Sequence, residues 1–308
     1  MENILVLNGP LKEVIWGGNY FKNELKMTDS DAKYGELWTC SGHKGGLSYI
    51  INGKYKDKSL DEVFANHKEL FNNSKLKDFP ILVKIIATSD KLSVQVHPDD
   101  KYAKENENQY GKTEGWLILD GNENSEIVIG HNAKNKEELI EYINNDNYDG
   151  LLRKKVVKTG EFYPIPSGTI HALGANIVLL EIQQSSDVTY RFYDYHRKDA
   201  LGNERPLHIN KAVEVTDYKP YNQTIINCFK DNINSIWNNE YFEVLYQEIN
   251  NEFTLENNNK YCIVTVIEGS IKVENNNIKK GQSFIVTALS KSVKLEGNGK
   301  VVITYSKI

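Results

Sequence analysis

The sequence predicts a mainly β protein, built as a sandwich or barrel with a few inserted helices. Many short segments are rich in Val, Ile and Tyr and are separated by Gly, Asn or Asp, a pattern typical of short strands joined by turns. Hydrophobic residues make up 40% of the 308 residues, which is enough for a substantial core. The segments with this pattern are 80–87, 115–120, 126–130, 177–183, 244–249, 261–267 and 301–305.

Four segments predict helices instead. The run Ser59-Leu-Asp-Glu62 is a capping box ahead of apolar residues, which predicts a helix over 60–72. Apolar residues at helical spacing predict a second helix over 136–145. Shorter helices are expected at 148–153 and 208–215.

A change in composition after about residue 225 predicts two domains. The last part of the chain is rich in Asn and Lys, and all seven histidines lie at or before His208. We therefore expect a first domain over 1–225, with helical insertions near 60–72 and 136–153. A smaller β domain over 226–308 is expected to bind no metal.

Charge and cysteine content argue against several classes of protein. A net charge of -5 without long runs of one sign argues against a nucleic-acid binder. No segment approaches the ~20 apolar residues of a membrane span, and the N-terminal apolar run is too short for a signal peptide. Cys40, Cys228 and Cys262 are too scattered for a disulfide framework, which fits free thiols in a reducing compartment. We expect a soluble, cytoplasmic protein with no nucleic-acid or membrane partner, whose oligomeric state the sequence leaves open.

Four residues from distant segments are candidate metal ligands. In Leu92-Ser-Val-Gln-Val-His97, strand alternation places Gln95 and His97 on one face, where they offer an oxygen and a nitrogen. Glu114 precedes an apolar run, and His171 follows a Pro-x-Gly turn. Zinc needs about four such ligands. Taken singly, His97 has an alternative as a strand end, Glu114 as a surface carboxylate and His171 as a core histidine.

Motif spacing adds a resemblance to a known family. Gly160, Pro166, Gly168 and His171 are spaced as in the second cupin motif, with Asn176 one residue later than usual. The first cupin motif is similar to Gln95, His97 and Glu114, with Gln in place of its first His and a longer spacer before the Glu. More closely, the chain resembles the short bacterial mannose-6-phosphate isomerases of type I over segments 93–100, 111–116, 165–174, 183–195, 11–18, 35–38 and 206–212.

This resemblance is strong over 8–220 and weak in the C-terminal domain. It implies a cupin-type β barrel (jelly roll) followed by a second, smaller cupin-like β domain. It also implies a zinc-dependent aldose–ketose isomerase that interconverts mannose 6-phosphate and fructose 6-phosphate through an enediol or enediolate. The family's zinc ligands fall on Gln95, His97, Glu114 and His171, with one Zn²⁺ per chain, and its active-site arginine falls on Arg191.

Isomerisation chemistry suggests roles for further residues. The guanidinium of Arg191 suits an enediolate or a phosphate, and an ion pair with Asp187 or Asp194 is its structural alternative. Lys112 neighbours a metal ligand and is expected to face the cavity, where it bonds substrate hydroxyls or acts as an acid. Glu181 is the candidate base, with a surface or hydrogen-bonding carboxylate as its alternative.

Substrate binding is expected from two more side chains. Ser93 neighbours the metal ligands on the same strand and should face the cavity. Arg197 is a candidate for the 6-phosphate of a hexose 6-phosphate, with an ordinary solvated charge as its alternative.

Two other functions stay open. A non-catalytic metal-cupin protein that binds a sugar needs the ligands but no cation beside them, and Arg191 and Lys112 argue against it. Another metal-dependent cupin enzyme, such as an iron dioxygenase, favours a His-rich triad. The Gln and the carboxylate favour zinc instead.

Overall fold

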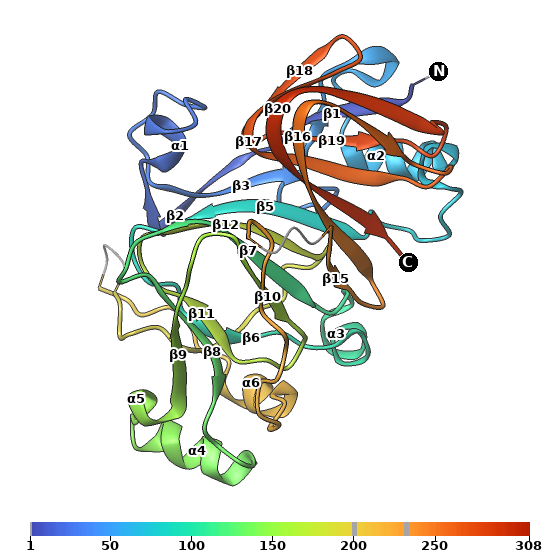
Figure 1. Ribbon diagram of the computed structural model, residues 1–308. Helices are drawn as coiled ribbons and strands as arrows, with labels where there is room; N and C mark the ends of the chain where they lie inside the picture. Colours follow the sequence, from blue (N-terminus) through green and yellow to red (C-terminus); the bar gives the residue numbers. More distant parts are fainter. Residues whose placement is uncertain (1, 199–201, 231–233) are drawn as a thin grey trace.

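Three β sheets stacked in layers make up most of the molecule, as a computed structural model that describes residues 2–198, 202–230 and 234–308 shows (Figure 1). A seven-stranded sheet lies in the middle. An eight-stranded sheet packs on one of its faces, and a five-stranded sheet packs on the other. The mainly β fold expected from the sequence is therefore confirmed.

The seven-stranded sheet is covered on both faces. Its neighbouring strands β5 and β12 are buried at every position, which explains their almost uninterrupted apolar sequences. In order across the sheet, the strands are β14 (Ile226–Asn227), β10 (Glu161–Ile165), β7 (Glu114–Gly121), β12 (Ile177–Gln184), β5 (Ile81–Ala87), β3 (Tyr34–Cys40) and β2 (Leu11–Gly18).

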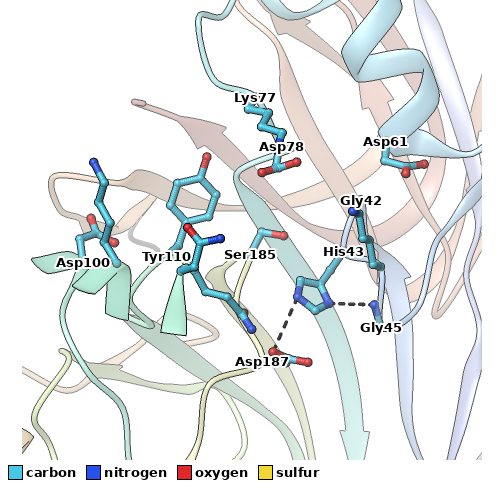
Figure 2. A pocket seen from close by; sticks show the side chains of 14 residues that line it. Gly42, His43, Gly45, Asp61, Lys77, Asp78, Asp100, Tyr110, Ser185 and Asp187 are labelled. Carbon is cyan, nitrogen blue, oxygen red and sulfur yellow. Dashed lines mark hydrogen bonds and ion pairs between the residues drawn. The ribbon is translucent and has the colours of Figure 1, made fainter. Parts of the chain in front are cut away.

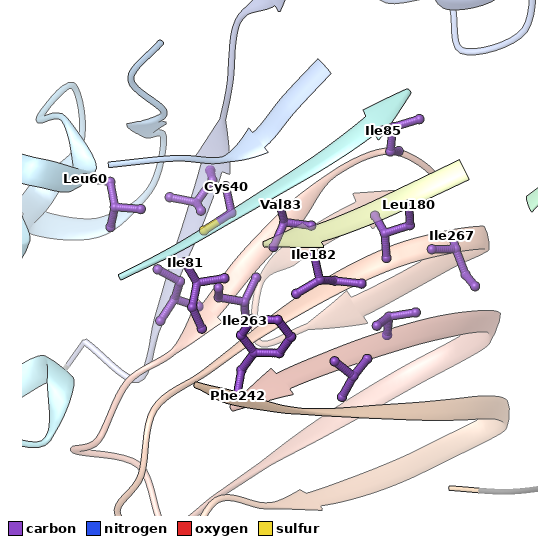
Figure 3. Close-up of a cluster of buried hydrophobic side chains, with 14 of the residues drawn as sticks. Cys40, Leu60, Ile81, Val83, Ile85, Leu180, Ile182, Phe242, Ile263 and Ile267 are labelled. Carbon is purple, nitrogen blue, oxygen red and sulfur yellow. The ribbon is translucent and has the colours of Figure 1, made fainter. Parts of the chain in front are cut away.

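The face of this sheet toward the eight-stranded sheet is apolar. Alternate residues of β5 and β12 point to this side, because side chains alternate along a strand. They pack against Phe242 and Ile263 of the eight-stranded sheet (Figure 3). The contributing residues of β5 and β12 include Val83, Ile85, Leu180 and Ile182.

The opposite face carries buried polar side chains. Lys84 lies on β5, Glu114 on β7, and Glu181 and Gln183 on β12. All four are buried, since the five-stranded sheet covers them. Buried charges are costly unless they are paired, so this face requires specific partners for each of them.

The five-stranded sheet supplies the other wall of this polar layer. Its outer face packs against helices α4 (Lys136–Asn144), α5 (Tyr148–Leu151) and α6 (Ile209–Val215). In order, its strands are β13 (Tyr190–Tyr193), β6 (Val94–Val96), β11 (His171–Leu173), β8 (Glu126–His131) and β9 (Leu152–Val156).

The eight-stranded sheet joins the two ends of the chain. The first strand, β1, pairs with β19 in antiparallel fashion, so the N-terminal segment completes a sheet made mainly of C-terminal strands. The division into domains 1–225 and 226–308 stays a prediction. The strands are β15 (Ser235–Asn238), β16 (Phe242–Glu256), β20 (Ser292–Ser306), β17 (Cys262–Val273), β19 (Ser283–Val286), β1 (Ile4–Asn8) and β4 (Tyr49–Ile50), with β18 (Asn276–Lys279) beside β17.

The predicted helices are confirmed with small changes of length. The segment 60–72 forms α2 (Leu60–Asn66) and a 3₁₀ turn, η2 (Lys68–Phe71). α5 ends where β9 begins at Leu152, so the predicted helix over 148–153 is shorter than expected. α4 and α6 lie at the predicted places, and two short elements, α1 (Tyr20–Asn23) and η1 (Gly53–Tyr55), were not predicted.

The prediction of a capping box at Ser59 was wrong. The Ser59 hydroxyl donates to the carboxylate of Asp61 instead of accepting from the helix backbone, and Glu62 pairs with Lys58. One further helix, α3 (Asp100–Glu107), was not predicted, because Ala103 is its only buried residue and it has no apolar stripe. Its beginning is marked by Asp99, whose side chain accepts from the backbone N–H of Tyr102.

Two expectations from composition can be compared with the structure. Cys40, Cys228 and Cys262 are all buried and form no disulfide, as expected. None of the helices in the described part of the chain has the length and apolar character that a membrane crossing requires.

Replacing Ile263 by Ala should test the packing between the seven- and eight-stranded sheets. Ile263 is fully buried there, so the cavity should lower the free energy of unfolding by about 2–5 kcal/mol. Urea denaturation measures this loss. Val156→Ala, at a half-exposed strand position, is the control and should change the free energy by less than ~0.5 kcal/mol. Equal effects of the two substitutions would contradict this packing.

Candidate active site

Four of the predicted site residues converge where β6, β7 and β11 meet. Gln95 lies on β6 opposite His171 on β11, His97 follows β6 directly, and Glu114 begins β7. The two imidazole Nε2 atoms are 3.1 Å apart, and the amide of Gln95 donates to His171 Nε2 at 3.4 Å. Glu114 Oε2 lies 3.5 Å from His97 Nε2, and Glu114 Oε1 lies 3.4 Å from His171 Nε2.

Hydrogen bonds and burial set the protonation of both histidines. Nδ1 of His97 donates to the carbonyl of Val188 at 2.8 Å, and Nδ1 of His171 donates to the carbonyl of Thr169 at 2.8 Å. Because Nδ1 carries the proton, each Nε2 presents a lone pair toward Glu114. Burial also lowers the pKa of His97 well below its usual value and that of His171 to about 4, so both rings stay neutral.

This donor set fits a divalent metal ion. Burial, followed by the neighbouring charge of Glu181, raises the pKa of Glu114 to about 7. Neither carboxylate oxygen of Glu114 accepts a hydrogen bond from the described residues, although Lys112 Nζ lies at ion-pair distance, 3.1 Å from Oε2. Two facing lone pairs and an unbonded buried carboxylate repel each other unless a cation lies among them. The ligand atoms of His97, Glu114 and His171 lie within 4.8 Å of one another, close enough to share one ion.

A buried ion pair lies on the same face of the seven-stranded sheet. Glu181 stands between Trp116 and Lys84 in the register of β7, β12 and β5. Lys84 Nζ is 2.9 Å from Glu181 Oε2, and the indole N–H of Trp116 donates to Glu181 Oε1 at 3.1 Å. Burial alone would raise the pKa of Glu181, but Lys84 and Lys112 outweigh it and lower that pKa to about 2. Glu181 is therefore buried and ionised, and it accepts a hydrogen bond as its alternative interpretation expected; its role as a base stays a prediction.

Lys84 and Glu36 were missed by sequence reasoning. Lys84 Nζ also lies 3.7 Å from Glu36 Oε2. Burial alone would lower the pKa of Lys84, but the carboxylates of Glu181 and Glu36 outweigh it and raise that pKa. One feature pointed to Lys84, because it is the single charge within the apolar strand segment 81–87. Glu36 lies inside one of the segments that carry the family resemblance. Nothing in its neighbouring residues indicated that it pairs with Lys84, which lies on β5.

Arg191 reaches toward the metal-site strand. It pairs in register with Gln95, and its Nε donates to the hydroxyl of Ser93 at 3.1 Å. Its Nη1 donates to the carbonyl of Pro206 at 3.0 Å. Among the described residues no carboxylate pairs with Arg191. The alternative of an ion pair with Asp187 or Asp194 is therefore not found, and a half-buried guanidinium is left without an anionic partner.

The nearby Asp194 and Asp187 pair with other side chains. Both Arg197 and Arg205 donate to the carboxylate of Asp194, and Arg197 also donates to the carbonyl of Lys91. Contact between Arg197 and a phosphate stays a prediction. Asp187 lies 3.8 Å from Nε2 of His43.

A cavity of about 850 Å³ adjoins this region (Figure 2). Asp187 and His43 line it on one side, while Asp100 and Tyr110 line it on another. Asp187 immediately precedes Val188, and the carbonyl of Val188 accepts from His97. The cavity wall is therefore one residue along the chain from a group that orients His97.

Comparison with known proteins decides the family. Residues 4–137 match the model of the phosphomannose isomerase type I catalytic domain, and residues 232–306 match that of the mannose-6-phosphate isomerase cupin domain. The chain is 39% identical to a mannose-6-phosphate isomerase of Streptococcus mutans over 99% of both chains. The chain belongs to the type I mannose-6-phosphate isomerase family. The resemblance seen in its motifs is thereby confirmed.

Solved structures support this family assignment. The mannose 6-phosphate isomerase from Bacillus subtilis superimposes with a TM-score of 0.91 at 37% identity, over 98% of this chain and 99% of that one. A phosphomannose isomerase from Salmonella typhimurium shares the fold, with a TM-score of 0.77 at 16% identity over 99% of this chain and 100% of that one. The expected cupin-type fold of this family member, including a C-terminal cupin domain, is confirmed.

Replacing Lys84 by Met should destabilise the protein strongly. The change leaves the ionised Glu181 buried without its cation, so the free energy of unfolding should fall by about 3–5 kcal/mol. Lys294→Met, which breaks exposed ion pairs with Glu252 and Glu296, is the control and should cost less than ~1 kcal/mol. Urea denaturation compares the two. Adding Glu181→Gln to Lys84→Met should recover part of the loss, and an unchanged or larger loss would count against the ion pair as the cause.

Proposed function

We propose that the chain is a zinc-dependent aldose–ketose isomerase that interconverts mannose 6-phosphate and fructose 6-phosphate, with one zinc ion per chain. One observation carries this proposal: a buried donor set that could hold a metal lies beside an ionised carboxylate and an arginine that, within the described residues, pairs with no carboxylate. The names of its relatives agree with it. Cys40, Cys228 and Cys262 are buried and none forms a disulfide, which fits a protein that works in the cytoplasm on a soluble sugar phosphate.

Four side chains would hold the ion: Gln95, His97, Glu114 and His171. Gln95 would offer its side-chain oxygen, because the amide nitrogen has no lone pair for a metal; this requires the amide to turn from the orientation in which its nitrogen donates to His171. Nitrogen ligands from two imidazoles, together with oxygen ligands, suit zinc. When bound, the ion supplies a Lewis acid for the negative charge that develops on O1 and O2 of the open-chain sugar.

Glu181 is the proposed base. Isomerisation moves one proton from C2 to C1, and a single carboxylate can accept that proton and return it, so no proton is gained or lost overall. Lys84 keeps Glu181 ionised, and the Trp116 indole fixes its orientation. A pKa near 2 also makes Glu181 a weak base, so the transfer depends on a C2–H that the adjacent carbonyl and cations make acidic.

Arg191 and Lys112 are the proposed cations of the reaction. Arg191 is held by Ser93 and the carbonyl of Pro206, so its remaining guanidinium N–H groups are free to stabilise an enediolate or to bind an anionic substrate group. Lys112, 3.1 Å from Glu114, is placed to donate to substrate oxygens beside the metal ligands. Arg197 is proposed to bind the 6-phosphate, which requires it to share or leave Asp194.

Removing the metal should abolish isomerisation. Dialysis against a chelator is expected to lower the rate by at least ~100-fold, since the ion supplies charge stabilisation that no protein group replaces. A coupled assay on mannose 6-phosphate measures the rate, and added Zn²⁺ should restore it. Mg²⁺ is the control and should restore little, because it prefers oxygen ligands. Two tightly bound zinc ions per chain would contradict the single site. Oxygen uptake on another substrate, with mannose 6-phosphate unchanged, would favour a dioxygenase.

Two substitutions should separate metal binding from chemistry. His97→Ala removes a ligand, so both bound zinc and turnover should be lost. Arg191→Ala leaves the four donors in place, so zinc should remain while kcat falls about 100-fold or more. Elemental analysis beside initial rates tests both. Normal kcat in Arg191→Ala would contradict the proposed role of that arginine. If the wild-type protein binds the sugar phosphate but does not convert it, the result would support a binding protein instead.

A further inference from the structure

The segment that carries Lys112 is held by three consecutive backbone hydrogen bonds. The N–H of Gly111 donates to Asp100 Oδ1 at 2.7 Å, and the N–H of Thr113 donates to Gln184 Oε1 at 2.9 Å. Between them, the N–H of Lys112 donates to the carbonyl of Pro98 at 3.0 Å. The peptide group after Lys112 is therefore fixed by Gln184, the one before it by the backbone of Pro98, and the next one back, at Gly111, by Asp100.

The two side chains that hold this segment are also bonded to each other. Gln184 Nε2 donates to Asp100 Oδ1 at 2.9 Å, so one carboxylate oxygen accepts from both Gln184 and Gly111. Gln184 is 1% exposed, and both ends of its amide are used. The result is a closed bracket of Asp100 and Gln184 around residues 111–113.

Residues 111–113 also pack closely against the backbone at the start of α3. A Cβ atom on Gly111 would lie 2.5 Å from backbone atoms of Asp99 and Asp100, so only glycine allows the chain to return this closely after α3. Asp100 itself lies at the start of α3 and lines the cavity in Figure 2. The bracket thus connects the cavity wall to the residue before Glu114.

We propose that Asp100 and Gln184 are positioning residues for Lys112, which fix the backbone from which its buried ammonium reaches Glu114. A lysine side chain has four rotatable bonds and a point charge, so its placement depends on a fixed Cα position and on packing. Lys112 is 5% exposed and its Nζ lies 3.1 Å from Glu114 Oε2. The catalytic consequence rests on the proposed function, in which Lys112 donates to the substrate beside the metal ligands. A shift of about 1 Å in such a group can lower a rate by about 100-fold.

A comparison of a disruptive with a conservative change in the pair is the sharpest test. Gln184→Glu places two carboxylates against each other and removes the bond from Gln184 Nε2, so kcat should fall at least about tenfold. Asp100→Asn keeps a side-chain oxygen that can accept from both Gln184 Nε2 and the Gly111 N–H. This conservative variant should keep kcat within about threefold of wild type, with zinc content unchanged throughout. Glu105→Gln, an exposed change on α3, is the matched control and should leave kcat unchanged.

A second arm tests whether the pair acts through Lys112. Asp100→Ala removes the acceptor of the Gly111 N–H and should lower kcat in the wild-type background. In a Lys112→Met background it should have no further effect, because the group being positioned is gone. Losses that multiply in the two backgrounds would overturn the proposal, as would normal kcat in Gln184→Glu or a kcat in Asp100→Asn as low as in Asp100→Ala. If Gln184→Glu fails to fold, the Asp100→Ala arm decides alone.

Hydrogen exchange gives a readout that does not need catalysis. Exchange in peptides that span residues 108–115 should rise in Asp100→Ala and Gln184→Glu, and should stay near wild type in Asp100→Asn, which keeps the accepting oxygen. Unchanged exchange in both Asp100→Ala and Gln184→Glu would overturn the bracket. If the wild type fails to isomerise mannose 6-phosphate, the proposed function falls, while the exchange pattern still decides whether this pair holds the Lys112 segment.

Discussion

The structure depends most on the cost of burying the Glu114 carboxylate where water cannot reach it. Two neutral imidazoles turn lone pairs toward this carboxylate, and among the described residues none donates a hydrogen bond to it. Their Nδ1–H bonds to backbone carbonyls prevent either ring from turning its donor inward. The surrounding strands therefore fix a set of donors that is unfavourable by itself and favourable around a cation. Lys112 relieves part of the charge, but from one side only.

The second constraint is that the central strands of the seven-stranded sheet have no solvent face. One side is an apolar layer against the eight-stranded sheet, and the other holds Glu114, a member of the cluster that could bind a metal, and the pair of Glu181 with Lys84. Strand alternation alone separates these two environments, residue by residue, along β5 and β12. The apolar layer makes the sheet rigid, and rigidity is what allows buried charges on its other side to keep their distances.

Sequence patterns predicted the parts of the site that depend on short spacings. Gln95 and His97 share a face by strand alternation, and the motif around His171 placed it with them; the structure brings these residues and Glu114 together. Lys84 was missed because its partners Glu36 and Glu181 are distant in sequence, and pairing across strands is not encoded in any local pattern; Glu36 was missed for the same reason. Helix α3 was missed for a related reason, since its place is set by its cap and by the return at Gly111 rather than by an apolar stripe.

The pairing of β1 with β19 has a consequence for synthesis of the chain. Ile4, Leu5 and Val6 are synthesised long before their partners Phe284, Ile285 and Val286. Until then one edge of β1 has no hydrogen-bonding neighbour, and its apolar side chains lack the C-terminal half of their core. Closure across so long a separation is slow, so the nascent polypeptide spends most of its translation with an exposed, aggregation-prone N-terminal strand.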